Sequence, residues 1–374
     1  MIKIDILEYK DNKYYYTLFD ILLKNLPITK DSFFKSLDIN PSTYRKCRIG
    51  ELKIGKQILN KLANYYEYKI PSNDLIDELN QNLNRIYDYM YYKMDKTFND
   101  DLNYLDNLIK ENYLIFPIIK LFKLLILVSQ NLDYNIIKNE YKELYKECTG
   151  YKKFYNESLL YVYNLISYIF FEEIPSDILT KEYIDGALYY GISSRCLIEG
   201  KYIECLYFTD KAEEYLYKDG NINRLLLLNN NKMISHLNMS NYKECIILAK
   251  RQFLILKSID TPNKNVLQKQ TERNFTCALL GLKEYRQVIE YYDTEVNFYL
   301  TDFLTLLIAK YYDNVNDYKM YFNDIKSEQE NDVLNLFDCM DLLDEYLNTR
   351  NKKLISNFKN YDVSELLIKI IKKI

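Results

Sequence analysis

Apolar residues recur every three to four positions along most of the chain, and short polar breaks separate these apolar runs. That spacing is typical of amphipathic α-helices, because half-buried strands alternate apolar and polar residues with a period of two. The 374 residues include only 8 glycines and 6 prolines, too few for the many tight turns of an all-β protein. The pattern therefore predicts an all-α fold.

The first 70 residues predict a small domain of short helices. An apolar face at 33–37 indicates one helix, and the polar break after it leads into a second. Asn40 is a good N-cap for the second helix, and Pro41 fits its first position, where the missing N–H costs nothing. We expect this helix to cover 41–48 and to end near a glycine, with a further helix over 54–66.

Charge is distributed unevenly between this N-terminal part and the rest of the chain. The segment 30–61 holds eight basic and three acidic residues, although the whole chain has a net charge of −3. A basic head on an acidic body indicates that the head meets a polyanion.

The helix predicted over 41–48 carries polar and basic side chains that suit the major groove of DNA. Hydroxyl groups reach phosphates and base edges, and guanidinium groups make paired hydrogen bonds to guanine. We expect base contacts mainly from Ser42, Thr43, Arg45 and Lys46, and a phosphate contact from Arg48. The residues expected to contact DNA are Asn40, Ser42, Thr43, Tyr44, Arg45, Lys46, Arg48 and Lys53.

The stretch 37–50, LDINPSTYRKCRIG, resembles the turn, recognition helix and terminal glycine of the lambda-repressor-like helix-turn-helix family. The resemblance covers roughly residues 15 to 68 and implies a DNA-binding domain over 1–70. It departs from the family at the preceding helix, where Thr29, Lys30 and the Phe33–Phe34 pair replace the usual Gln and Leu-Ala. The alternative is an ordinary basic helix pair without a ligand.

The body, 72–374, predicts paired helices with similar breaks at 199–205, 239–245 and 282–288. Each break carries a tyrosine at the same place, and Tyr202, Tyr242 and Tyr285 follow one another at intervals of 40 and 43 residues. One such hairpin cannot bury its apolar face alone, so we expect the hairpins to stack. The pattern resembles divergent tetratricopeptide (TPR) repeats, which implies a right-handed superhelix. The tail 364–374 is interpreted as a capping helix or a dimer contact.

Asparagines lie at equivalent positions in two of these hairpins. Asn231 and Asn274 each precede the tyrosine of the following break by eleven residues. An asparagine amide can bond both the N–H and the C=O of an extended peptide, so these positions suit a peptide ligand. The residues expected to contact a peptide on the inner surface are Tyr190, Ser194, Asn230, Asn231, Gln270, Arg273, Asn274 and Lys310. The alternative is that asparagine is simply abundant.

A helix-turn-helix head on a TPR body resembles the RRNPP family of peptide-responsive quorum-sensing regulators. The resemblance implies a transcription regulator that binds operator DNA as a homodimer and a short signalling peptide in its concave groove. A competing interpretation is a TPR interaction protein similar to the Rap group of response-regulator antagonists, which does not read DNA.

Other classes of function find little support in the sequence. There is no glycine-rich phosphate loop, zinc signature or nucleophile motif, and the single histidine, His236, lies on an apolar helix face, so we expect neither an enzyme nor a cofactor or metal. The seven scattered cysteines indicate small buried residues in a reducing compartment. The charged N-terminus is unlike a signal peptide, and the apolar stretch 113–128 is too short and too charged to span a bilayer. These features predict a cytoplasmic protein and a buried helix over that stretch.

Overall fold

The computed structural model describes residues 2–11, 14–25, 29–49, 51–52, 55–92, 98–130, 134–175, 185–261, 263–292, 300–328, 334–351, 353–360 and 365–372. Within these ranges the chain is helical and has no strand, which confirms the predicted all-α class. One isolated bridge pairs Lys69 with Tyr113. The helices group into two compact units, one formed by 1–195 with 214–221 and the other by 196–213 with 222–374.

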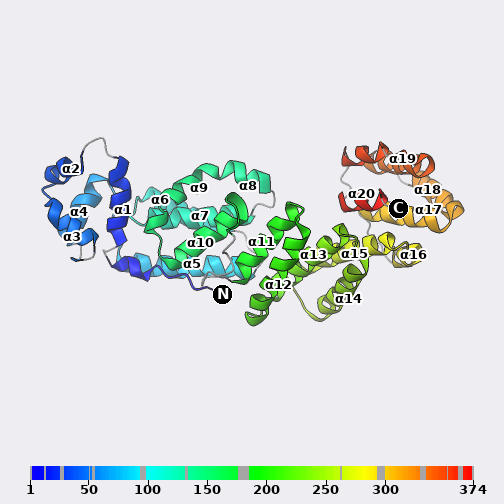
Figure 1. Ribbon diagram of the computed structural model, residues 1–374, viewed down its shortest axis with the longest axis horizontal. Coiled ribbons are helices and arrows are strands. Elements are labelled where there is room, and N and C mark those ends of the chain that lie inside the picture. Colours follow the sequence, from blue (N-terminus) through cyan, green and yellow to red (C-terminus); the bar gives the residue numbers. More distant parts are fainter. Residues whose placement is uncertain are drawn as a thin grey trace. The chain divides into compact units, whose positions relative to one another are not determined.

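Among the described residues, the first unit begins with four α-helices of seven to ten residues, and its longest helix, of 20 residues, follows them (Figure 1). Its α-helices are α1 (Tyr15–Leu22), α2 (Lys30–Ser36), α3 (Pro41–Arg48), α4 (Lys56–Tyr65), α5 (Asn73–Tyr92), α6 (Asn99–Lys110), α7 (Phe116–Gln130), α8 (Tyr134–Glu140), α9 (Lys142–Gly150) and α10 (Glu157–Ile166). Short 3-10 helices cover Leu7–Lys10, Leu23–Asn25 and Lys152–Phe154, and a π-helical turn, Ser167–Phe171, follows α10.

The helices of the second half are α11 (Gly186–Ile198), α12 (Tyr202–Lys218), α13 (Ile222–Asn238), α14 (Tyr242–Ser258), α15 (Lys264–Gly281), α16 (Tyr285–Tyr292), α17 (Leu300–Asp313), α18 (Val315–Glu328), α19 (Leu334–Thr349) and α20 (Glu365–Ile371). A 3-10 helix covers Leu354–Asn360. The start of α11 and the end of α12 belong to the first unit, and α13 to α20 belong to the second.

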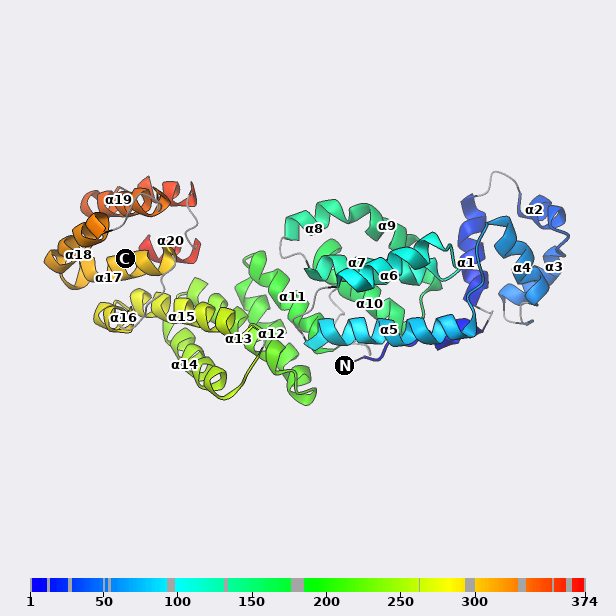
Figure 2. The same ribbon diagram turned by 180° about the vertical axis from the view of Figure 1, so that it is seen from behind.

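The boundary expected near residue 71 lies inside the first compact unit. The reason is that the first residues of the chain contact helices beyond residue 71. Ile4 bonds Asn84 of α5, Asp5 bonds Ser158 of α10, and α5 packs on α7. Figure 2 shows this end of the chain alongside α5. Helix α7 forms much of the core of this unit and is buried from Phe116 to Val128 at most positions, which confirms the helix expected over the apolar stretch. Ser72 caps α5 through its hydroxyl, which accepts the N–H of Leu75 at 3.1 Å.

The three predicted breaks are tight turns of one design. At each turn one residue adopts a positive φ, namely Gly200 (74°), Ser240 (65°) and Lys283 (66°). In each case this residue donates its N–H three residues back, and the next residue donates its own five residues back, as in Lys283 to Leu280 and Glu284 to Leu279. This pairing satisfies the last carbonyls of the preceding helix. The repeated tyrosine then begins the following helix in all three turns.

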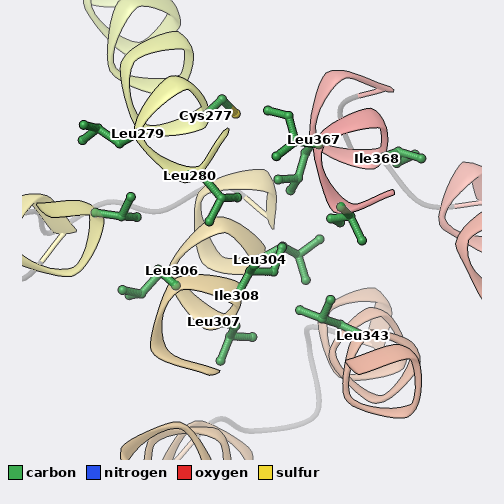
Figure 3. Packing of buried hydrophobic residues seen from close by; sticks show 14 of the residues in the cluster. Cys277, Leu279, Leu280, Leu304, Leu306, Leu307, Ile308, Leu343, Leu367 and Ile368 are labelled. Carbon is green, nitrogen blue, oxygen red and sulfur yellow. The ribbon is translucent and has the colours of Figure 1, made fainter. Parts of the chain in front are cut away.

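Unit two has a continuous apolar core that includes the C-terminal tail. Leucines and isoleucines of α15, α17, α19 and α20 converge in this core (Figure 3). On α20 four apolar residues are buried: Leu367, Ile368, Ile370 and Ile371. Lys369, on the same helix, bonds Asn238 of α13 at 2.7 Å. The apolar stripe of the tail is therefore covered by the chain itself. No helix among the described residues is long and apolar enough to cross a membrane.

Candidate functional site

Helix α3 begins and ends where the sequence predicts. The Oδ1 of Asn40 accepts the N–H of Ser42 at 2.9 Å, so Asn40 is the N-cap, and Pro41 occupies the first helical position. This cap satisfies one of the free N–H groups at the helix start and fixes the direction in which α3 leaves the turn. The turn before it includes Asp38 at a φ of 50°.

The inner face of α3 is held by an aromatic cluster. Tyr44 is only 4% exposed, and its ring lies 4.4 Å from Phe34 on α2 and 5.3 Å from Tyr16 on α1. Its hydroxyl donates to Asp20 at 3.1 Å, and burial together with this carboxylate raises the tyrosine pKa. Tyr44 therefore lies in the core of the head and not on the surface expected of a DNA contact. Cys47 is buried beside it, three residues further along the same face.

The outer face of α3 is polar and basic. Ser42, Arg45, Lys46 and Arg48 are exposed, and Thr43 is half-buried. Among the described residues neither Arg45 nor Lys46 has a carboxylate partner, whereas Arg48 lies 3.6 Å from Asp20. These side chains form one cationic surface on a helix that is anchored from behind. The expected contact Lys53 and the expected cap Gly50 lie outside the described residues.

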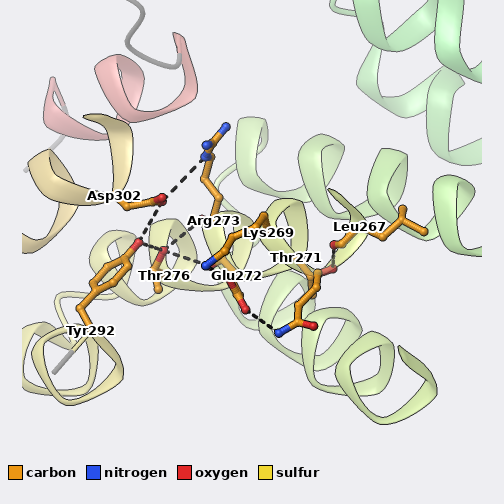
Figure 4. A network of polar contacts seen from close by, with 9 residues as sticks. Leu267, Lys269, Thr271, Glu272, Arg273, Thr276, Tyr292 and Asp302 are labelled. Atoms are coloured by element: carbon orange, nitrogen blue, oxygen red, sulfur yellow. Dashed lines mark hydrogen bonds and ion pairs between the residues drawn. The ribbon is translucent and has the colours of Figure 1, made fainter. Parts of the chain in front are cut away.

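A series of side-chain hydrogen bonds joins three helices of the second unit. Asn229 of α13 donates to the Gln252 side-chain oxygen at 2.5 Å, and Gln252 of α14 donates to the Thr271 hydroxyl of α15 at 2.9 Å. Thr271 in turn donates to the carbonyl of Leu267 (Figure 4). Each amide or hydroxyl group in this series of hydrogen bonds has a partner, which is the condition under which buried polar groups are tolerated.

Three of the residues expected to bind a peptide contact one another next to this series of hydrogen bonds. The Nδ2 of Asn274 donates to Asn230 at 2.7 Å, and Asn230 donates to Gln270 at 3.3 Å. Asn230, Asn231 and Asn274 are buried, and Gln270 is half-buried. The alignment on the turn tyrosines pairs Asn231 with Asn274, whereas the hydrogen bond in the structure joins Asn274 of α15 to Asn230 of α13.

Arg273 and Lys310 of the same predicted set make contacts within the second unit. The Nε of Arg273 lies 3.8 Å from Asp302 on α17, and Asp302 accepts a hydrogen bond from the Tyr292 hydroxyl at 3.2 Å (Figure 4). Burial, with the nearby Asp302 carboxylate, raises the pKa of Tyr292. Lys310 lies over the ring of Tyr321, 4.6 Å from its centroid.

The remaining two, Tyr190 and Ser194, belong to the other compact unit. Both lie on α11 and are half-buried, and the carbonyl of Tyr190 accepts the hydroxyl of Ser193 at 2.8 Å. The predicted peptide set is therefore divided between the two units, and hydrogen bonds join its members Asn230, Gln270 and Asn274.

Polar residues outside the predicted sites bind a different backbone segment. The backbone around Asp5 is held by Asn80 and Asn84 of α5 and by Asn156 and Ser158 at the start of α10. A signal for this segment exists in the sequence: apolar and charged residues alternate over 2–6, IKIDI, which has the period of two of an extended chain.

The chain was compared with protein-family models, curated proteins and solved structures, and none of the three comparisons finds a match.

Proposed function

We propose that the protein is a DNA-binding regulator that responds to a short peptide. In this proposal α2 and α3 form a helix-turn-helix reader of the lambda-repressor-like kind, and α3 enters the major groove. The helix hairpins α13–α14 and α15–α16 belong to a TPR-like body whose inner surface receives the peptide. The proposal follows the resemblance to the RRNPP family and includes a homodimer that presents two heads to an operator.

The observation that carries the DNA part is the two-sided construction of α3. Tyr44 and Cys47 fix one face against α1 and α2, while Arg45 and Lys46 face solvent without a carboxylate partner among the described residues. Ion-paired surface lysines and arginines are common, but an anchored helix with an uncompensated basic face suits a polyanion. Ser42, at the capped start of the helix, adds a hydroxyl at the end that reads base edges in this class of proteins.

The peptide part is supported by the amide group Asn230–Gln270–Asn274. Amides that bond one another can exchange those bonds for the N–H and C=O groups of an extended backbone, at little net cost in hydrogen bonds. Arg273 lies next to them on α15 and is half-buried, where it can pair with a peptide carboxylate.

The DNA part is tested by removing two charges from α3. On duplexes that lack the operator, Arg45 and Lys46 meet phosphates in place of their bases. We therefore expect Arg45→Ala with Lys46→Ala to weaken binding to a library of random-sequence duplexes and to lower the salt slope of log K by about 2, since each phosphate contact contributes about 0.9. The matched control is Lys250→Ala with Arg251→Ala, an exposed adjacent pair on α14. If both double variants bind the library equally well, α3 is not the reader, and the interaction-protein alternative takes its place.

The peptide part is tested separately, with a pool of short synthetic peptides. Gln270→Ala and Asn274→Ala should each lose the peptides that the unchanged chain retains, whereas Asn265→Ala, at an exposed position of the same helix, should retain them. Retention of the same peptides by all three variants would exclude the amide group as the site.

A further inference from the structure

The first residues of the chain occupy a groove in the first unit in the way that a bound peptide does. Residues 2–6 lie outside any helix and lead into the 3-10 helix Leu7–Lys10, and we call residues 2–9 the strap. The groove is formed by Asn80 and Asn84 of α5 on one side and by Asn156 and Ser158 at the start of α10 on the other.

Contacts between the strap and α5 use both hydrogen-bonding groups of the strap backbone. Asn84 accepts the N–H of Ile4 at 2.9 Å and donates to the carbonyl of Ile4 at 2.7 Å. One helical turn away, Asn80 accepts the N–H of Ile6 at 2.9 Å. A single asparagine that bonds both groups of one residue is a clamp for extended backbone, and it places no demand on the side chain of that residue.

The spacing of the two asparagines matches an extended ligand. Residues four apart on a helix are separated by about 6 Å along its axis. Two residues of an extended chain span about 6.6 Å. Asn84 and Asn80 can therefore hold every second residue of a strap that runs antiparallel to α5.

On the opposite side, the residue between these two is held by α10. The carbonyl of Asp5 accepts the Nδ2 of Asn156 at 2.6 Å and the Ser158 hydroxyl at 3.2 Å, and the same hydroxyl accepts the Asp5 N–H at 3.1 Å. Further along, the Tyr9 hydroxyl donates to the carbonyl of Phe154 at 2.6 Å and accepts the N–H of Asn156 at 3.0 Å.

Selectivity comes from the side chains that point into the groove. Ile4 and Ile6 are both 0% exposed, whereas Lys3 before them and Asp5 between them are exposed. The burial of both isoleucines favours a ligand with branched apolar side chains at alternate positions. A hollow beside the strap is lined by Lys3, Glu8, Asn156 and their neighbours, so the outer edge of the groove is open.

We propose that this groove is a binding site for extended peptides with branched apolar residues at alternate positions, and that the strap is its intramolecular ligand. The site lies wholly within the first unit, separate from the amide group of α13 and α15, and the inference does not depend on DNA binding. A ligand that displaces the strap also removes Tyr9 from Phe154, on whose ring Tyr15 of α1 rests at a centroid distance of 6.4 Å. Helix α1 also carries Asp20, which accepts a hydrogen bond from Tyr44 of α3. Two contacts, Phe154 with Tyr15 and Asp20 with Tyr44, therefore connect the groove to α3.

The test uses the synthetic peptide IKIDILEY, which is the strap itself. A tethered segment acts at an effective concentration of the order of millimolar, so the unchanged chain should bind the free peptide weakly. In the full chain with Ile4→Asp and Ile6→Asp the strap no longer fits, and we expect the free peptide to bind about tenfold more tightly or better. Adding Asn84→Ala to that variant should abolish the gain, and adding Gln81→Ala, at an exposed position of α5, should not.

A second measurement uses the unchanged chain, so the result does not depend on the variants folding. The amide hydrogens of Ile4 and Ile6 should exchange faster than those of α7, because the strap opens locally, and saturating free peptide should accelerate them further. Exchange of both amides at the rate of α7, unaffected by the peptide, would show that the strap is a fixed part of the core and would overturn the proposal. Equal peptide binding by the variants with and without Asn84 would overturn it as well.

Discussion

The hydroxyl of Tyr44 on α3 donates a hydrogen bond to the carboxylate of Asp20 on α1, 3.1 Å away. Asp20 also lies 3.6 Å from Arg48, so one carboxylate binds both the buried and the exposed face of the same helix. The orientation of α3 therefore depends on α1 as well as on the preceding turn.

Replacement of Tyr44 by phenylalanine removes this bond and keeps the ring in its cluster. We expect Tyr44→Phe to lower the free energy of unfolding by about 1 kcal/mol, the usual net value of a buried hydrogen bond. Urea unfolding followed by circular dichroism measures the change. Tyr65→Phe is the control, because Tyr65 is exposed and its ring lies in the same head. Equal stability of the two variants would contradict a stabilising role for the bond.

The three equivalent turns each hold one residue at a positive φ. This residue is a glycine only at Gly200, and it is Ser240 and Lys283 in the other two turns. A side chain in this conformation costs about 1–2 kcal/mol, part of which glycine returns through its freer unfolded state. We expect Lys283→Gly and Ser240→Gly each to raise the free energy of unfolding by about 0.5–1 kcal/mol. Gly200→Ala should lower it by about 1 kcal/mol. A loss of stability in both glycine variants would show that these turns are held by other contacts.

The seven cysteines are all buried and free, so their thiols should react slowly. Burial raises the pKa of Cys148, Cys277 and Cys339 to about 12. At pH 8 such a thiol is ionised to about 1 part in 10⁴, and the thiolate is the reactive form. We expect iodoacetamide to modify these three cysteines in urea but not in native buffer at pH 8, as read by mass spectrometry. Rapid labelling of any of the three in native buffer would show that its helix opens.

His236 gives a pH dependence whose sign follows from its surroundings. Burial lowers the pKa of this imidazole below its ordinary value of 6.5. The unfolded chain therefore binds the proton first as the pH falls, and stability present above pH 6.5 is lost as the pH falls through the folded pKa. Because the chain has one histidine, its NMR titration is unambiguous. His236→Gln should flatten the loss of stability between pH 7 and 5, and an unchanged slope would contradict this assignment.

Local patterns in the sequence predict several elements of the fold. The bounds of α3, its Asn40 cap, the three tyrosine turns and the buried α7 all follow from local rules, because capping, turn chemistry and apolar periodicity act over a few residues. The scattered positions of the seven cysteines predict that they are buried, and this prediction is confirmed. The polar character of the outer face of α3 is likewise visible in the sequence.

Tertiary structure decided the partners of these elements. The sequence predicts Tyr44 on the DNA surface, yet packing against Phe34 and Tyr16 places it inside, because three aromatic rings from three helices bury more apolar area together. The pairing of Asn274 with Asn230 joins residues 44 apart, and the clamp of Asn84 on Ile4 joins residues 80 apart. No local pattern specifies such pairs. The sequence by itself determined the helices, their caps and their turns, whereas only the folded chain decided which amides bond each other and which segment fills the groove on α5, since those contacts depend on positions set by the whole core.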